Sequence, residues 1–155
     1  MDADTGDVVV LRRPRGESDV APAARLHRAS MRAAMPGLAV VHTPGEDVAW
    51  MRDTVFATQS VWLACTGDTM IGIASRDGNR LTQLYVAPDR LGRGIGALLL
   101  GRVLEEEPEI ELWTFQRNAR ARRFYERHGF EAVEFTDGAG NEEREPDVRY
   151  RRSRG

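Results

Sequence analysis

The chain has 155 residues, of which 41% are hydrophobic and 30% are charged, and its formal net charge is −2. This length suits one domain with a real hydrophobic core, so we expect a single domain over residues 1–155 with flexible ends at 1–7 and 153–155. The composition argues against general affinity for nucleic acid and against a membrane span, and the acidic start lacks the pattern of a signal peptide.

The first part of the chain predicts one strand and two helices. A β-branched run at 8–13 predicts the strand, and a helix follows over about 18–35 with Asp19 or the residue before it as its N-cap. Apolar residues are sparse in this helix, so we expect part of it to face a cleft. Residues 43–46 have the form of a capping box, which predicts a second helix over 44–58.

The rest of the chain alternates apolar runs with turn residues. Strands are expected at 60–65, 70–76, 80–86, 110–115, 130–135 and 148–152, and helices at 97–106 and 119–128. Short turns join the first three of these strands, so they predict an antiparallel meander. Hairpins that are followed by an alternation of helices and strands are typical of an α+β fold in one unit.

Cys65 is the single cysteine of the chain, at the end of an apolar run. No disulfide within the chain and no cysteine-based metal site can therefore form, and we expect a core cysteine, a cytoplasmic location and no metal. All 22 basic residues are arginine. No lysine is therefore available as a Schiff base or an internal acceptor.

A glycine-rich turn carries Gly92, Gly94 and Gly96 between the expected strand at 80–86 and the helix that follows. Glycines allow positive φ and a close approach of ligand, and the free N–H groups at the start of a helix favour phosphate. Nearby arginines add positive charge. From these residues alone, the turn is either a phosphate site or a tight structural turn without a ligand.

The same turn also fits G-x-G-x-x-A, a relaxed dinucleotide-binding fingerprint that ends at Ala97. However, the strands before this turn are expected to form hairpins, whereas the dinucleotide-binding fold begins with a βαβ unit. The next strand is followed by Gln116 and Arg117, without the carboxylate that would bind a ribose. We therefore keep a nucleotide-binding oxidoreductase only as a third hypothesis.

Two segments resemble the GNAT superfamily, the Gcn5-related N-acetyltransferases. Residues 91–96 align with its pyrophosphate motif Q/R-x-x-G-x-G/A, and residues 118–130 match its signature N-x-x-A-x-x-F-Y-E-x-x-G-F. The resemblance implies a three-layer α/β arrangement, in which about four helices flank a mixed, mostly antiparallel sheet of about seven strands. It also implies a V-shaped gap between the strands at 80–86 and 110–115, which admits the acetyl-CoA donor.

The resemblance implies an acetyl-CoA-dependent transfer to a primary amine in a ternary complex. Tyr125 would be the general acid, and the amide of Val86 would polarise the thioester carbonyl. Leu91 stands where the family has glutamine or arginine, which removes one side-chain contact. The expected cofactor-binding residues are Leu84, Tyr85, Val86, Leu91, Gly92, Arg93, Gly94, Ile95, Gly96, Ala97, Asn118, Ala121 and Phe124.

The sequence gives fewer signals for the residues that bind the acceptor. Met31, His42 and Glu143 are the expected substrate residues, and the acidic segment 142–147 would attract a cationic amine. His42 is also a candidate base. The acceptor is left open between a small amine and a peptide or protein N-terminus, and a homodimer is common among relatives; neither nucleic acid nor membrane is an expected partner. The alternative function is a non-catalytic acyl-CoA-binding module.

Overall fold

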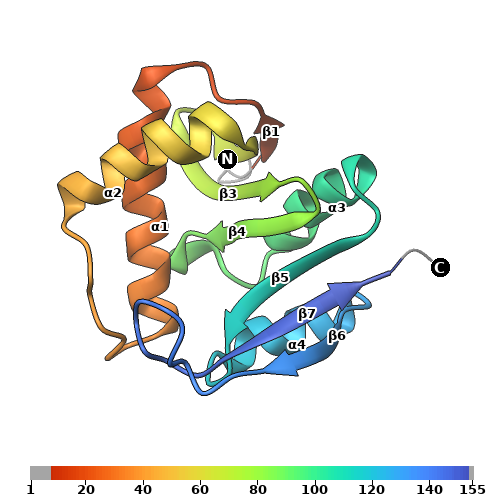
Figure 1. The fold of residues 1–155 in the computed structure, drawn as a ribbon. Coiled ribbons are helices and arrows are strands. Elements are labelled where there is room, and N and C mark those ends of the chain that lie inside the picture. The colour runs from red at the N-terminus through yellow and green to blue at the C-terminus, as the bar shows by residue number, and fades with distance from the viewer. Residues whose placement is uncertain (1–7, 154–155) are drawn as a thin grey trace.

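The computed structural model describes residues 8–153, so the expectation of flexible ends falls outside the described residues except at Ser153. A seven-stranded sheet runs through the molecule in the order β1-β2-β3-β4-β5-β7-β6 (Figure 1). All neighbouring strands are antiparallel except β4 and β5, which are parallel. The predicted mixed sheet with an antiparallel meander is thus confirmed. The strands are β1 (Val10–Arg12), β2 (Ser60–Thr66), β3 (Thr69–Asp77), β4 (Arg80–Val86), β5 (Ile110–Phe115), β6 (Glu131–Phe135) and β7 (Asp147–Arg152).

The helices cover both faces of this sheet and complete the predicted three layers (Figure 1). On one face lie α1 (Val20–Ala34), α2 (Pro44–Trp50) and the π-helical turn η3 (Met51–Phe56). On the other face lie α3 (Ile95–Glu106) and α4 (Ala119–Arg127). Two short 3₁₀ turns, η2 (Glu17–Asp19) and η4 (Pro88–Arg90), precede α1 and the glycine turn.

Each face of the sheet has its own apolar core. Leu99 of α3 and Tyr125 of α4 belong to one cluster of buried residues, while Val20 of α1, Met51 and Ile73 belong to the other. Burying one such aliphatic side chain contributes roughly 1.5–3 kcal/mol, so these clusters fix the helices on the sheet. The predicted core position of Cys65 is confirmed by its burial in the second cluster.

The two predicted helix starts on the α1–α2 face have different outcomes. At α2, the capping box forms, because Thr43 Oγ1 accepts a hydrogen bond from Glu46 N while Glu46 Oε1 accepts one from Thr43 N. At α1, Asp19 occupies the cap position, but its side chain makes no cap hydrogen bond. Its carboxylate accepts two bonds of 2.9 Å from Arg12 and one of 2.7 Å from Arg15 N. Asp19, the expected cap residue, therefore links the start of α1 to Arg12 of β1 through hydrogen bonds.

The strands β4 and β5 are paired only at their beginnings, through Arg80–Glu111 and Leu81–Leu112. In the pairing with β3, Ser75 faces Gln83 and Arg76 faces Leu81, so Thr82 is the extra residue of a β-bulge. A bulge bends its strand and increases its twist. Because this bulge comes directly after the last residue paired with β5, β4 turns away there and the predicted V-shaped gap opens.

Candidate active site

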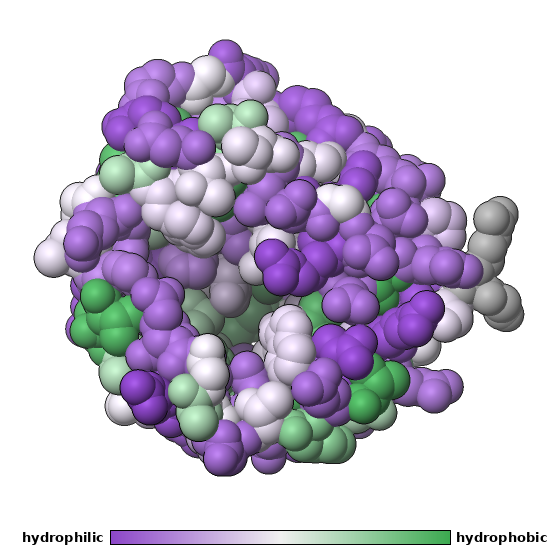
Figure 2. All heavy atoms as spheres, in the orientation of Figure 1, coloured by the Kyte–Doolittle hydropathy of each residue, from purple (hydrophilic) through white to green (hydrophobic). Residues whose placement is uncertain are grey.

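A cavity of about 690 Å³ opens where β4 and β5 separate. Figure 2 shows a hollow near the middle of the face seen in Figure 1, with mostly polar residues around its rim. The cavity is bounded by the last turns of α1, the edge of β4, the glycine turn with the start of α3, and one side of α4. It therefore occupies the gap in the sheet.

The edge of β4 presents unpaired backbone groups to this cavity. Val86 is paired with Gly72, and the ladder hydrogen bond there runs from Ala87 N to Ile71 O at 2.8 Å. This is the pattern of a non-hydrogen-bonded pair, so the N–H and C=O of Val86 point away from β3. The alternation of the ladder gives Leu84 the same orientation. Two N–H groups thus face the gap, where an extended ligand could pair with them as an added strand.

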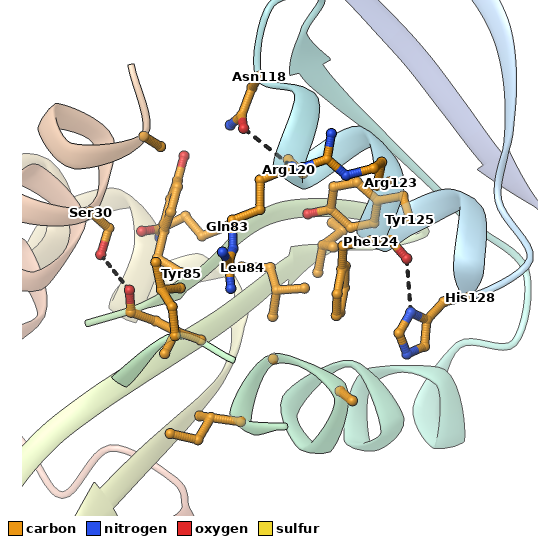
Figure 3. A pocket seen from close by; sticks show the side chains of 18 of the residues that line it. Ser30, Gln83, Leu84, Tyr85, Asn118, Arg120, Arg123, Phe124, Tyr125 and His128 are labelled. Atoms are coloured by element: carbon orange, nitrogen blue, oxygen red, sulfur yellow. Dashed lines mark hydrogen bonds between the residues drawn. The ribbon is translucent and has the colours of Figure 1, made fainter. Parts of the chain in front are cut away.

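Ser30 of α1 contacts the same edge. Its hydroxyl donates a hydrogen bond of 3.1 Å to the carbonyl oxygen of Val86 (Figure 3). The carbonyl would otherwise have no partner on an open edge, so this bond fixes the last residue of β4 against α1. No local sequence pattern predicts this contact, because the two residues are 56 positions apart.

The glycine turn leads the chain directly into α3. Gly92 and Gly94 have φ of 78° and 82°, in the left-handed region where a side chain is strained. Gly94 is the N-cap of α3, so the amides of Ile95, Gly96 and Ala97 are free of partners inside the helix. They lie at the positive end of a helix of 12 residues, and all three residues line the cavity. This geometry suits a pyrophosphate.

Four arginines, Arg90, Arg120, Arg123 and Arg127, line the same end of the cavity. Among the described residues that line it, none is an aspartate or a glutamate. The cavity is therefore positively charged, and a ligand that fills it should carry several negative charges.

Tyr125 places a hydroxyl opposite the edge of β4 (Figure 3). Its side chain is 7% exposed and its ring packs edge-on against Phe124 and Phe130, both at 5.4 Å between ring centroids. Burial raises the pKa of Tyr125 above its ordinary value, and the nearby Tyr85 raises it further. At neutral pH the phenol therefore keeps its proton and can donate it.

The expected cofactor-binding residues converge on this cavity. All of them line it except Arg93, and Tyr125 lines it as well. The Asn118 side chain also caps α4, where its Oδ1 accepts a hydrogen bond of 3.2 Å from Ala121 N. Leu91 lies at the rim with 43% of its surface exposed. Their roles as ligands stay predictions.

The three expected acceptor residues lie elsewhere, in a second and smaller hollow of about 100 Å³. Met31, His42 and Glu143 all line it. His42 Nε2 is 3.2 Å from a carboxylate oxygen of Glu142, which joins the loop before α2 to the loop between β6 and β7. Tyr85 lines the main cavity and its ring contacts His27, which lines the second hollow. Burial and the charge of Glu143 raise the pKa of Tyr85 to about 12.

Two features are absent from the part of the chain that the structure describes. None of the helices in residues 8–153 combines the length and the apolar character needed to cross a bilayer. Within the same residues, no group of three or more His, Cys, Asp or Glu side chains is placed to hold a metal ion.

Comparison with known proteins identifies the class to which this fold and site belong. Residues 57–132 match the family model described as acetyltransferase (GNAT) domain. An N-acetyltransferase of Archaeoglobus fulgidus that is described as uncharacterized is 31% identical over 111 residues, which are 68% of this chain and 67% of that protein. The chain therefore belongs to the GNAT acetyltransferase family, as the two sequence motifs predicted.

Other relatives match over shorter segments. A protein named probable N-acetyltransferase from Mycobacterium tuberculosis is 38% identical over 80 residues, or 46% of each chain. A peptidyl-lysine N-acetyltransferase of Escherichia coli is 32% identical over 85 residues, which are 54% of this chain and 58% of that protein. The matches thus span about half the length of these two relatives.

The fold is also found among solved structures. The PaiA N-acetyltransferase of Thermoplasma acidophilum, solved in complex with coenzyme A, superposes with a TM-score of 0.69 at 19% identity. The superposition covers 95% of this chain and 99% of that one. At this identity the likeness establishes the fold.

Proposed function

We propose that the protein is an acetyl-CoA-dependent N-acetyltransferase that acts on a primary amine. One observation carries the proposal: the open edge of β4 and the free amides at the start of α3 face one cationic cavity. Coenzyme A combines a pyrophosphate with a long arm that contains two amide groups. The first part suits the amides of the helix start, and the second suits an unpaired strand edge.

In the proposed complex, the pyrophosphate lies on the amides of 94–97 and the pantetheine arm pairs with Leu84 and Val86. The acetyl-CoA thioester then lies beyond Val86, close to Tyr125 and Tyr85. The Thermoplasma structure, which holds coenzyme A on the same fold, supports a donor site of this kind. The arginines that line the cavity would neutralise the phosphates of the cofactor. Because Leu91 stands where the family has glutamine or arginine, these arginines would bind the phosphates without help from a side chain at position 91.

The proposed chemistry is a direct attack of the amine on the thioester carbonyl carbon. The N–H of Val86 stabilises the negative charge that develops on the carbonyl oxygen. The C–N bond forms, the C–S bond breaks, and the leaving thiolate takes a proton from Tyr125. The buried phenol is protonated at neutral pH, so the proton is present for this step, although its raised pKa makes the transfer to the thiolate less favourable than for an exposed tyrosine.

We infer that the acceptor amine approaches from the second hollow. Its lining includes Glu143 and the apolar side chain of Met31, which suit an ammonium group on an apolar stem. One relative is named a peptidyl-lysine N-acetyltransferase, which favours a lysine side chain as the first acceptor to test. Small amines and peptide N-termini belong in the same panel.

The test measures thiol release from acetyl-CoA with lysyl peptides, peptides with a free N-terminus and small amines. Tyr125→Phe removes one oxygen and keeps the packed ring. We expect it to lower kcat about 10²- to 10⁴-fold while the Kd of acetyl-CoA stays within about threefold. If the unmodified protein binds acetyl-CoA but turns over no amine in the panel, it is a non-catalytic binding module and the proposal is wrong. If it does not bind acetyl-CoA, the donor site is wrong as well.

A further inference from the structure

His27 is a histidine of α1 that the sequence did not single out. It precedes Ser30 by three residues, so the two side chains lie on the same side of the helix. Its ring packs against Trp50 of α2 at 5.1 Å and edge-on against Tyr85 of β4 at 5.0 Å between centroids. It also lines the second hollow. His27 therefore stands between the edge of β4 and the space proposed for the acceptor.

The two ring nitrogens of His27 have different surroundings. Within residues 8–153, the buried side-chain polar atoms without a hydrogen bond are His27 Nδ1 and Gln83 Oε1. Gln83 lies two residues before Tyr85 on β4, so its side chain is on the face of the strand that meets the His27 ring, and Gln83 raises the pKa of that ring. The structure thus places an unused donor position beside an unused acceptor. The other nitrogen, Nε2, is not among the buried unpartnered atoms, and His27 is one of the residues that line the second hollow.

A chain of hydrogen bonds fixes the orientation of the Gln83 amide. Gln83 Nε2 donates to Ser75 Oγ at 3.0 Å, and Ser75 Oγ is 2.7 Å from Thr82 Oγ1. Thr82 Oγ1 in turn donates to Gln59 Oε1 at 2.6 Å. Because the amide nitrogen is held in this chain, its oxygen is left for Nδ1–H of His27. That tautomer leaves a lone pair on Nε2, on a residue that lines the second hollow.

The surroundings keep His27 neutral near pH 7. Burial is the largest influence and lowers its pKa below the ordinary value of 6.5; Asp47 and Gln83 raise it by less, and Arg28, the smallest influence, lowers it. Asp47 is itself paired with Arg28 at 2.6 Å. The other titratable groups around the ring and the hollow are Arg32 of α1, His42 of the loop before α2, Tyr85 of β4 and Glu143 of the β6–β7 loop.

We propose that His27 is the general base of the transfer reaction and takes a proton from the acceptor ammonium at Nε2, while Gln83 orients the ring through Nδ1–H. The inference rests on the proposed function. The orienting group is an uncharged amide, so Gln83 fixes the tautomer without raising the basicity of the ring as a carboxylate would.

The protons balance in the proposed sequence. The acceptor enters as R–NH₃⁺, and one proton moves to His27 Nε2, which frees the lone pair for attack. The new C–N bond forms at the thioester carbon and the C–S bond breaks. The thiolate sulfur takes the proton of Tyr125, and the second proton of the acceptor nitrogen replaces it on the tyrosine oxygen. The products are the acetamide, coenzyme A with a free thiol, and a proton that His27 releases to solvent.

The experiment follows kcat against pH for the unmodified protein, His27→Gln and Gln83→Glu, with acetyl-CoA and the best amine of the panel at saturation. For the unmodified protein we expect kcat to fall on the acid side, below about pH 6.5, as His27 takes up a proton. His27→Gln should lose at least about 100-fold in kcat at pH 7, keep the Kd of acetyl-CoA, and show a rate that rises steadily with pH. Gln83→Glu puts a carboxylate beside Nδ1 and should move the acid limb to higher pH.

The outcomes separate this inference from the proposed function. An unmodified protein without turnover on any amine would contradict the proposed function, and this inference with it. Turnover with kcat and acid limb unchanged in His27→Gln would overturn the base alone. If His27→Gln does not fold, Gln83→Glu decides, because an acid limb that stays in place there also overturns the role of His27.

Discussion

Gly72 of β3 lies under the start of α3 at the point where the two elements are closest. A Cβ atom built on Gly72 would be 2.9 Å from Leu99 Cδ1, and 3.3 Å from both Ala64 Cβ and Ile95 Cγ2. Leu99, Ala64 and Ile95 are all buried, so none can move into solvent. The residue is therefore a glycine because α3 must approach the sheet closely there.

We expect Gly72→Ala to destabilise the fold. Overpacking of a filled core costs about 1–3 kcal/mol, and the gain in backbone entropy from alanine offsets roughly 0.5–1 kcal/mol. With the middle of each range, the net loss in the free energy of unfolding is about 1 kcal/mol, measured by urea denaturation. Since Ile95 and Leu99 belong to α3, the displaced helix start should also weaken acetyl-CoA binding.

Gly101→Ala is the matched control. Gly101 lies in the middle of the same helix, and a Cβ there would have no neighbour within 4 Å. The same substitution should therefore stabilise the protein by about 0.5–1 kcal/mol and leave acetyl-CoA binding unchanged. If Gly72→Ala were as stable as the unmodified protein while Gly101→Ala behaved as expected, the close approach of α3 would not constrain this position.

Three further predictions concern single contacts. Ser30→Ala should cost about 1–2 kcal/mol in urea denaturation without ligand, because the carbonyl of Val86 loses its partner on the open edge; an unchanged midpoint would contradict this. Arg120→Gln should weaken acetyl-CoA about fivefold at low salt and less at high salt, whereas Arg102→Gln, which changes the charge equally outside the cavity, should leave the Kd unchanged in calorimetry. The hydrogen bonds from Arg12 lower the pKa of Asp19 below 3.8, so this pair stabilises the fold above that pH and the contribution is lost as pH falls through the lowered pKa. Asp19→Asn should therefore lose about 3 kcal/mol at pH 7, and the difference from the unmodified protein in urea denaturation should shrink as pH falls below 3.8.

The elements around the proposed donor site could be predicted from the sequence because their determinants are local. Gly92 and Gly94 need glycine for their backbone angles, and the helix that starts at Ile95 is coded by adjacent residues. The strand at 80–86 and the strand at 110–115 were predicted with the bounds that the structure has. Local chemistry of this kind leaves a signal in a single sequence.

The gap in the sheet and the position of His27, the proposed base, both depend on contacts between distant segments. The bulge at Thr82 is accompanied by bonds to Gln59 and Ser75, which no short window of sequence contains. The prediction that part of the first helix faces a cleft was right, since Ser30 lines the cavity. The sparse apolar pattern could not show, however, that His27 would meet the ring of Tyr85.

The sheet is joined across its middle by only the two residue pairs between β4 and β5. A bound cofactor would lie in the gap where β4 and β5 are not paired, and it would contact β4 on one side and α4 on the other. It would thus add contacts between the part of the sheet that ends with β4 and the part that begins with β5. Binding should then be visible far from the donor site, as slower amide exchange along β5 and β7. At a cofactor concentration of 100 times Kd, binding raises the free energy of unfolding by about 2.7 kcal/mol. If the protein uses acetyl-CoA as proposed, cells that deplete acetyl-CoA and coenzyme A would thereby also lower its stability.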